Sequence, residues 1–248
     1  MIRGKLIFYF CFFSCLSIVF SSCSTKKKTW FSRQYHNTTA RYNGYFNGNE
    51  SIKYGVKKIN DSFEDDYSTI LPVFKTGNLK KSKSTHPYMD KAIQKGSIVI
   101  QKHSIKIRGK EYCRWIDDNY FMIGKAYYYK GEFDEAIKTF SFIMEEYKKS
   151  LMSYKASLWL ARCFIEKKDY ASAEAILIDL GNNRLFPKEL KKDYEIINAD
   201  LNLRQKNYPL AKEALLNLSL IHTSEPTRQE AISYAVFCLK KKRGGGGG

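Results

Sequence analysis

The chain has 248 residues, enough for one sizeable domain or for an array of short repeats with a tail. Hydrophobic residues make up 44% and aromatic residues 15%, so most of the chain is expected to fold rather than stay disordered. The formal net charge of +17 raises nucleic acid as a partner. Lys and Arg are spread along the chain, however, and no nucleic-acid-binding motif accompanies them. We therefore expect a solvated basic surface and no nucleic-acid partner.

The first 22 residues have the layout of a secretory signal. A short basic start precedes an apolar run over residues 6–20, and small residues follow just before Cys23. Residues 20–23, with the sequence FSSC, resemble the lipobox of bacterial lipoproteins. That resemblance implies a cleaved signal peptide over 1–22, a lipid on Cys23 and a polar tether over 23–29. The alternatives are an ordinary cleaved signal or an uncleaved anchor, with Cys23 incidental.

The residues after Cys23 bear on the destination of such a lipoprotein. No aspartate directly follows this cysteine to argue for the inner membrane, and no acidic cluster follows to argue for export to the cell surface. We expect the protein at the outer membrane, lipid-anchored on its periplasmic face. Several acyl chains would hold it there far more firmly than one.

Residues 30–110 are expected to form a divergent helical region that resembles a repeat and contains a long loop. Aromatic residues recur at helical spacing from 35 to 46, and the Asn-Gly-Asn at 47–49 is expected to break this helix before a second one over 51–59. Residues 61–86 are polar and irregular and read as the long loop. A further helix is expected from Met89 to about Ile105.

Three short motifs in this region carry a family resemblance. They are YHN at 35–37, ARYN at 40–43 and NGNES at 47–51. Their order resembles the segment after the lipobox in the SprE/PorW lipoproteins of the Bacteroidetes type IX secretion and gliding-motility system. The resemblance extends to about residue 218. It implies a periplasmic scaffold whose partners are other protein subunits of the secretion and motility machinery.

The clearest pattern lies in residues 119–140, which read as two short amphipathic helices around a turn at 130–132. The second helix opens with Phe133 and Ala136, and the same phase recurs 37 and then 38 residues later. This pattern resembles the tetratricopeptide repeat, whose usual period is about 34 residues. The signature positions are Gly124, Tyr127, Phe133, Ala136, Phe140, Ala161, Tyr170, Ala173, Tyr208 and Ala211.

The recurring phase predicts an all-α fold, a solenoid of antiparallel helix pairs of the tetratricopeptide type. About three repeats are expected over 111–219, the last of them truncated; the alternative is a helical bundle without true repeats. Stacked repeats leave a concave groove. Tyr128 and Tyr129 are candidate partner-groove residues, with packing between helices as the alternative for them and for Tyr127.

No pattern in the sequence favours catalysis, a metal or a cofactor. The six cysteines form no CxxC pair, and His36, His86 and His103 are far apart in the sequence. The carboxylate sets at 64–66 and 117–118 have no nucleophile or base beside them. We therefore expect a protein that is not an enzyme and binds neither metal nor cofactor.

Residues 220–248 depart from the repeat pattern. The segment ISYAVFCLKK at 232–241 resembles the conceptual translation of a sequencing adapter, and five glycines end the chain. We expect 220–248 to be adapter read-through and give it no functional weight; the alternatives are a native tail or a linker. The function expected from the rest is a lipid-anchored scaffold of type IX secretion and gliding. A lipoprotein of another envelope assembly, such as outer-membrane protein assembly or a cell-wall enzyme complex, is the alternative.

Overall fold

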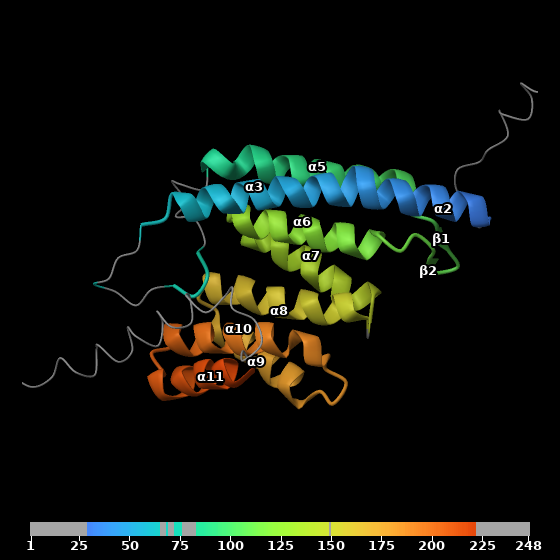
Figure 1. Ribbon diagram of the computed structural model, residues 1–248. Helices are drawn as coiled ribbons and strands as arrows, with labels where there is room; N and C mark the ends of the chain where they lie inside the picture. Colours follow the sequence, from blue (N-terminus) through green and yellow to red (C-terminus); the bar gives the residue numbers. More distant parts are fainter. Residues whose placement is uncertain (1–28, 65–67, 69–71, 76–82, 149, 222–248) are drawn as a thin grey trace, which may run out of the picture.

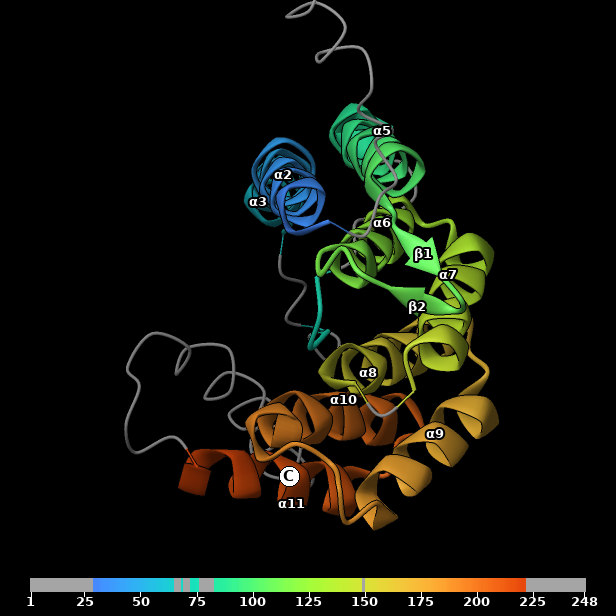
Figure 2. The same ribbon diagram turned by 90° about the vertical axis from the view of Figure 1, so that its right-hand side faces the viewer.

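The computed structural model describes residues 29–64, 68, 72–75, 83–148 and 150–221. The predicted signal peptide, Cys23 and all but the last residue of the tether therefore lie outside the described residues, as does the tail from 222 onward. The described helices stack into a curved, two-layered array (Figures 1 and 2). None of them is both long and apolar enough to cross a membrane.

The array begins with one long helix, where the sequence suggested two. It runs through α2 (Trp30–Thr39), a π-helical segment η1 (Ala40–Phe46) and α3 (Asn47–Asp61) without interruption. The predicted break at 47–49 is therefore wrong. The side-chain amide of Asn47 donates to the carbonyls of Tyr42 and Asn43 at 3.4 and 3.1 Å, within the helix itself.

The glycines of this helix serve close packing rather than a turn. A Cβ atom built on Gly44 would lie 1.9 Å from Cγ2 of Val99, and one on Gly48 would lie 2.5 Å from Sδ of Met122. Neither position has room for a side chain, so glycine lets the neighbouring helices approach. The tertiary contacts thus override the local preference of Asn-Gly-Asn for a turn.

The long helix pairs with α5 (His86–His103), which runs antiparallel to it after a short 3₁₀ turn, η2 (Lys83–Thr85) (Figure 1). A small hairpin follows, with β1 (Lys106–Ile107) paired to β2 (Lys110–Glu111). Both turn residues between the strands, Arg108 and Gly109, have positive φ, as a tight type I′ hairpin requires. The Glu111 carboxylate accepts hydrogen bonds from Ser104 Oγ and from the backbone N–H groups of Ile105, Tyr112 and Cys113.

Three further helix pairs complete the array, in the register that the sequence predicted. Their second helices begin at Phe133, Tyr170 and Tyr208. Each pair packs on the next, as in a solenoid. The pairs are α6 (Ile116–Lys130) with α7 (Phe133–Glu146), α8 (Leu151–Glu166) with α9 (Tyr170–Asn182), and α10 (Lys191–Arg204) with α11 (Tyr208–Ile221), with the 3₁₀ turn η3 (Lys188–Leu190) before α10. Helix α11 includes residues 220 and 221, the first two of the predicted tail over 220–248.

The turn inside each of these pairs is built in the same way. Gly131, Lys168 and Lys206 occupy equivalent positions, and all three have the left-handed conformation, with φ of 83°, 63° and 63°. At each turn two backbone N–H groups donate hydrogen bonds to carbonyls in the last turn of the first helix, for example Gly131 N to the Tyr128 carbonyl. The side chain of Asp169 then caps the start of α9 by accepting from Ser172 N at 3.2 Å.

Each of these pairs has a small buried residue on the first helix and a large buried one at a matching position of the second. Gly124 is in contact range of Phe140, because a Cβ on this glycine would lie 2.6 and 2.7 Å from two atoms of the Phe140 ring. The equivalent positions are Ala161 with Leu177 and Ala199 with Leu215, and all four of these residues are buried. The first repeat thus combines glycine with phenylalanine, where the other two combine alanine with leucine.

We expect Gly124→Ala to destabilise the protein by about 1–2 kcal/mol, since the added methyl overpacks a ring that is fully buried. Combining Gly124→Ala with Phe140→Leu copies the second repeat and should recover part of that loss. Urea unfolding of the wild type, both single variants and the double variant measures the coupling. Additive effects of the two substitutions would contradict the direct contact.

Candidate functional site

The inner side of the curve is lined by the first helix of each pair. Figure 2 shows α6, α8 and α10 on this side, with α7 and α9 forming the outer layer. The side chains on the inner faces of α6 and α8 form the candidate site. Its centre is an arginine on α8 that lies among aromatic rings.

That arginine is Arg162, which is buried although it carries a charge. Its guanidinium carbon lies 4.0 Å from the ring centre of Trp159 and 4.8 Å from that of Tyr128. One terminal nitrogen donates to the Tyr128 hydroxyl at 3.4 Å, whereas Nε has no hydrogen-bond partner among the described residues. Among the described residues Arg162 forms no salt bridge, so its charge is stabilised by the aromatic rings and by the Tyr128 hydroxyl.

Trp159 connects the first two complete repeats. Its ring lies 5.3 Å from the ring of Tyr128, 5.9 Å from that of Tyr129 and 6.0 Å from that of Phe121. The sequence analysis did not single out this residue. The only signal in the sequence was a tryptophan in the middle of the first helix of a repeat. A tryptophan at such a position is also common in an ordinary packed core.

The two predicted groove residues, Tyr128 and Tyr129, differ in how deeply they are buried. Tyr128 is only 1% exposed, so its prediction as a groove surface residue is wrong. It packs beneath Trp159 and Phe133, and burial raises the pKa of its hydroxyl. Tyr129 is partly buried, and its ring meets those of Tyr128 and Trp159. Tyr127 is likewise partly buried, against the α6–α8 core.

A second cation lies beside this cluster. Lys125 of α6 places its ammonium 5.3 Å from the ring centre of Trp159. Burial and the neighbouring charges of Arg162, Lys53 and Lys155 lower its pKa to about 8. Lys125 has no salt bridge within the described residues. Two cations from adjacent repeats therefore share one tryptophan without a carboxylate partner, an arrangement that suits an anionic ligand.

The charges further along the inner face are compensated. Arg204 of α10 contacts Glu166 at 2.8 Å and Asp200 at 3.4 Å. Burial raises the pKa of Asp200, and the Arg204 charge opposes that shift. The α8–α10 end of the inner face is thus an internally paired network, whereas Lys125 and Arg162 form no salt bridge within the described residues.

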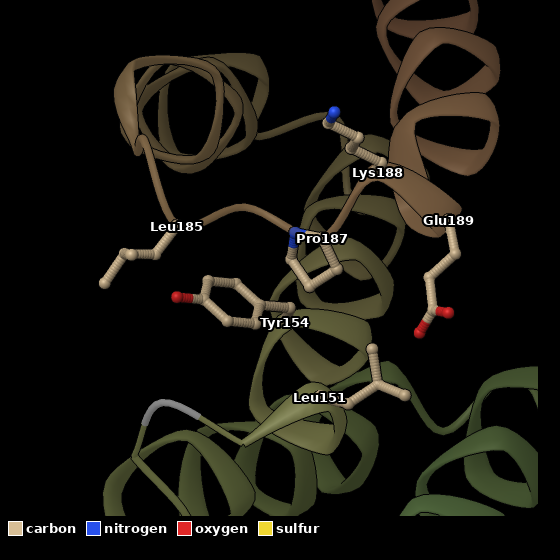
Figure 3. A pocket seen from close by; sticks show the side chains of 6 residues that line it. All are labelled: Leu151, Tyr154, Leu185, Pro187, Lys188 and Glu189. Carbon is tan, nitrogen blue, oxygen red and sulfur yellow. The ribbon is translucent and has the colours of Figure 1, made fainter.

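An apolar depression lies at the opposite end of α8, away from the cations. It measures about 580 Å³ and is formed by Leu151 and Tyr154 of α8 together with Leu185, Pro187, Lys188 and Glu189 of the connection to α10 (Figure 3). Figure 3 shows Tyr154 and Pro187 facing each other across the opening. It holds no arrangement of nucleophile and base.

The acidic residues and cysteines that could serve catalysis or bind a metal are buried to different degrees. Asp117 and Asp118 lie in the first turn of α6, and burial raises the pKa of both, that of Asp118 to about 6. The thiols of Cys113 and Cys163 are buried and free, and burial raises their pKa values to about 11 and 12. Among the described residues no group of three or more His, Cys, Asp or Glu side chains could hold a metal ion.

The fold does bring together two histidines that are distant in the sequence. Nδ1 of His36 and Nδ1 of His103 are 2.8 Å apart, between α2 and α5, and both rings are buried. One ring must donate and the other accept, so at least one of them is neutral. Burial lowers the pKa of His103, and the charges of His36 and Lys102 lower it further.

Comparison with known proteins supports the repeat interpretation. Residues 121–180, which cover most of the α6–α9 repeats and include Trp159 and Arg162, match the family model described as tetratricopeptide repeat. The helical array is a tetratricopeptide-repeat solenoid. Repeats of this kind act as protein–protein interaction scaffolds, and that is the class of function the match supports. No curated protein sequence matches the chain.

The two arginines of the inner face should respond oppositely to the same substitution. Arg162→Met removes a buried charge without a carboxylate partner, so the free energy of unfolding should stay unchanged or rise. Arg204→Met leaves two largely buried carboxylates without their cation and should cost about 2–3 kcal/mol. Chemical denaturation of both variants decides this. A large loss for Arg162→Met would mean that the ring contacts of this arginine outweigh the cost of burying it.

The histidine pair should make stability depend on pH. Because the pKa of His103 is lowered in the folded state, its contribution is complete above the unfolded value of about 6.5 and is lost as the pH falls through the folded value. The free energy of unfolding should therefore drop between pH 7 and pH 5. The variant His36→Phe/His103→Phe should show a smaller drop than the wild type and than the control His86→Gln.

Proposed function

We propose that this chain is a lipid-anchored scaffold on the periplasmic face of the outer membrane, and that it binds other subunits of the type IX secretion and gliding machinery. The tetratricopeptide-repeat fold supports the general role, since such arrays present a concave surface to protein segments. The resemblance at residues 35–51 and the lipobox-like residues 20–23 support the specific one.

The observation that carries the binding role is the unpaired charge on the inner face. Burying a cation without a carboxylate is costly, and replacing it by an apolar residue would remove that cost. Lys125 and Arg162, from two adjacent repeats, nevertheless both contact the Trp159 ring, at 5.3 and 4.0 Å from its centre. A partner segment that supplies the missing negative charge gives these residues a role in binding.

The motifs that carry the family resemblance have a structural role and do not form the inner face. The carbonyl oxygen of the Asn37 side chain accepts from Arg114 N at 2.7 Å, and Ser51 Oγ donates to the Tyr88 carbonyl at 2.9 Å. His36 meets His103. These residues fix the first helix pair to its neighbours. The resemblance therefore concerns how the array begins, and partner choice belongs to the inner face of α6 and α8.

Genetic deletion in the native host tests the proposal. Loss of the gene should abolish secretion of type IX cargo into the culture medium, and the wild-type gene should restore it. Cys23→Ala should move the protein from the membrane fraction to the soluble periplasmic fraction, because it removes the site of the acyl chains. Cargo secretion and membrane fractionation are measured in the same strains.

Cys113→Ala is the matched control, since Cys113 is buried in the fold and should not affect fractionation. Normal secretion in the deletion strain would overturn the type IX assignment. Cys23→Ala protein that stays with the membrane would overturn the lipid anchor. Capture of barrel-assembly or peptidoglycan proteins without type IX subunits would favour a scaffold of another envelope assembly.

A further inference from the structure

The long first helix of the array, α2–η1–α3, packs on its neighbours mainly through small side chains. Its buried positions recur about every four residues, and the wider turn of the π-helical segment keeps them on one side. They are His36, Ala40, Gly44, Gly48, Ser51, Ile52, Gly55 and Ile59. A Cβ atom on Gly55 would lie 2.5 Å from Cε of Met89 in α5, a close fit like those at Gly44 and Gly48. Helices α5 and α6 therefore approach the long helix on its small-residue side.

The large aromatic side chains of the same helix lie on its exposed side. Phe31 is 79% exposed and Tyr54 is 64% exposed, and four further rings are each more than half exposed. Those four are Trp30, Tyr35, Tyr42 and Phe46. Figure 2, which looks along this helix, shows α5 and α6 on one side of it and no described helix on the other. From Phe31 to Tyr54 these six rings, the aromatic face, extend for roughly 35 Å along the helix axis.

This arrangement reverses the usual one. A surface helix normally buries its large apolar side chains and exposes its polar ones. Here glycine and alanine are buried and six rings face solvent, so the repeats themselves do not bury those rings. A continuous row of exposed apolar side chains marks a site of interaction with another protein or with a membrane surface.

The composition of the aromatic face favours a membrane surface. All of the exposed large apolar side chains between residues 30 and 61 are aromatic, and four of the six are tryptophan or tyrosine. These two residue types are enriched at the level of the lipid headgroups, because their rings have an apolar body and a polar edge. Residues 30–61 also contain five basic and two acidic side chains, and three lysines precede them at 26–28. This excess of positive charge suits anionic headgroups.

The position of the face in the chain favours the same occupant. The apolar run over residues 6–20 and the lipobox-like cysteine both precede it, and Cys23 is only seven residues before Trp30. Even a fully extended chain of that length spans at most about 25 Å. A lipid on Cys23 would therefore hold the start of the long helix close to the bilayer.

We propose that the aromatic face lies on the surface of the membrane to which the chain is anchored, with the long helix parallel to the bilayer. The rings enter the headgroup region, and the basic side chains meet anionic headgroups. Figures 1 and 2 show α8–α11 at the opposite end of the array, so the later repeats stand away from the lipid. The proposal rests on the membrane location proposed above and specifies how the array is oriented there.

Quenching of tryptophan fluorescence by lipids with brominated acyl chains tests the orientation. The full chain is reconstituted into vesicles of phosphatidylethanolamine and phosphatidylglycerol. Trp30→Phe is the parent, because it removes the tryptophan next to the anchor and keeps a ring there. Adding Tyr54→Trp puts a probe at the far end of the aromatic face, and adding Ile178→Trp puts a control probe at a comparably exposed position of α9.

The emission added by Tyr54→Trp should be quenched about threefold more strongly than the emission added by Ile178→Trp, because only the first probe lies at the bilayer. Equal quenching of the two probes would overturn the proposal, since the chain would then be held by its N-terminus alone. Equal quenching together with a dimer that Tyr42→Ser/Phe46→Ser dissociates would assign the face to a second copy of the chain.

Two double variants of the Tyr54→Trp chain test whether the rings hold the helix on the lipid. Tyr42→Ser/Phe46→Ser removes two rings from the middle of the face and should at least halve the quenching. Ile178→Ser/Leu210→Ser removes two comparably exposed apolar side chains from α9 and α11 and should leave the quenching unchanged. Circular dichroism checks that both variants keep the fold. Undiminished quenching without the two rings would contradict the proposal.

The lipid composition tests the charge. Replacing phosphatidylglycerol by phosphatidylcholine, or adding salt, should weaken the quenching at Tyr54→Trp, because either change reduces the attraction between basic side chains and headgroups. Quenching that is unaffected by both changes would remove the basic residues from the proposal.

The outcome is separable from that of the proposed function. Strong quenching at Tyr54→Trp, with Cys23→Ala protein that stays in the membrane fraction, would sustain the aromatic face and reject the lipid anchor. Release of the Cys23→Ala protein, with equal quenching of the two probes, would sustain the anchor and reject the aromatic face.

Discussion

The structure depends on one steric constraint, the close approach of the two helices of a repeat at a small residue of the first helix, which is seen directly where Gly124 contacts Phe140. Gly124 faces Phe140, and alanine–leucine pairs take the equivalent places in the next two repeats. The summed volume of the two side chains sets how closely the helices of a pair approach. That spacing fixes the stacking of neighbouring pairs, and the stacking in turn curves the inner face on which Trp159 and Arg162 lie.

Much of the fold could be predicted from the sequence because it follows from local patterns. Apolar periodicity placed the starts of α7, α9 and α11, and the turns before them share one backbone conformation. The predictions failed where contacts between residues that are distant in the sequence determine the local structure. The Asn-Gly-Asn at 47–49 reads as a breaker, but Gly48 continues a helix because Met122 fills the space beside it. The hairpin at 106–111 has two residues per strand, too few for a periodic signal.

The candidate site was less predictable than the fold. The sequence predicted groove residues near the end of α6, but a tyrosine at helical spacing can point either into the groove or beneath it, and Tyr128 is beneath. Arg162 and Trp159 became visible only when α6 and α8 were placed together. Phe74 lies in a segment without periodicity, and its contact with Arg162 joins residues that are far apart in the sequence. The two histidines, 67 residues apart, meet for the same reason.

The unequal pairs of residues also bear on how such an array can change over generations. If only the helix with the glycine or only the helix with the phenylalanine is exchanged, the contact gains a clash or a void. Exchange of the complete helix pair keeps both residues together. The smallest segment that can be duplicated, lost or exchanged between arrays is therefore the hairpin, with its own left-handed turn. A single helix must match its partner helix in side-chain volume at this contact. Recombination inside a hairpin would separate the matched residues and would be selected against.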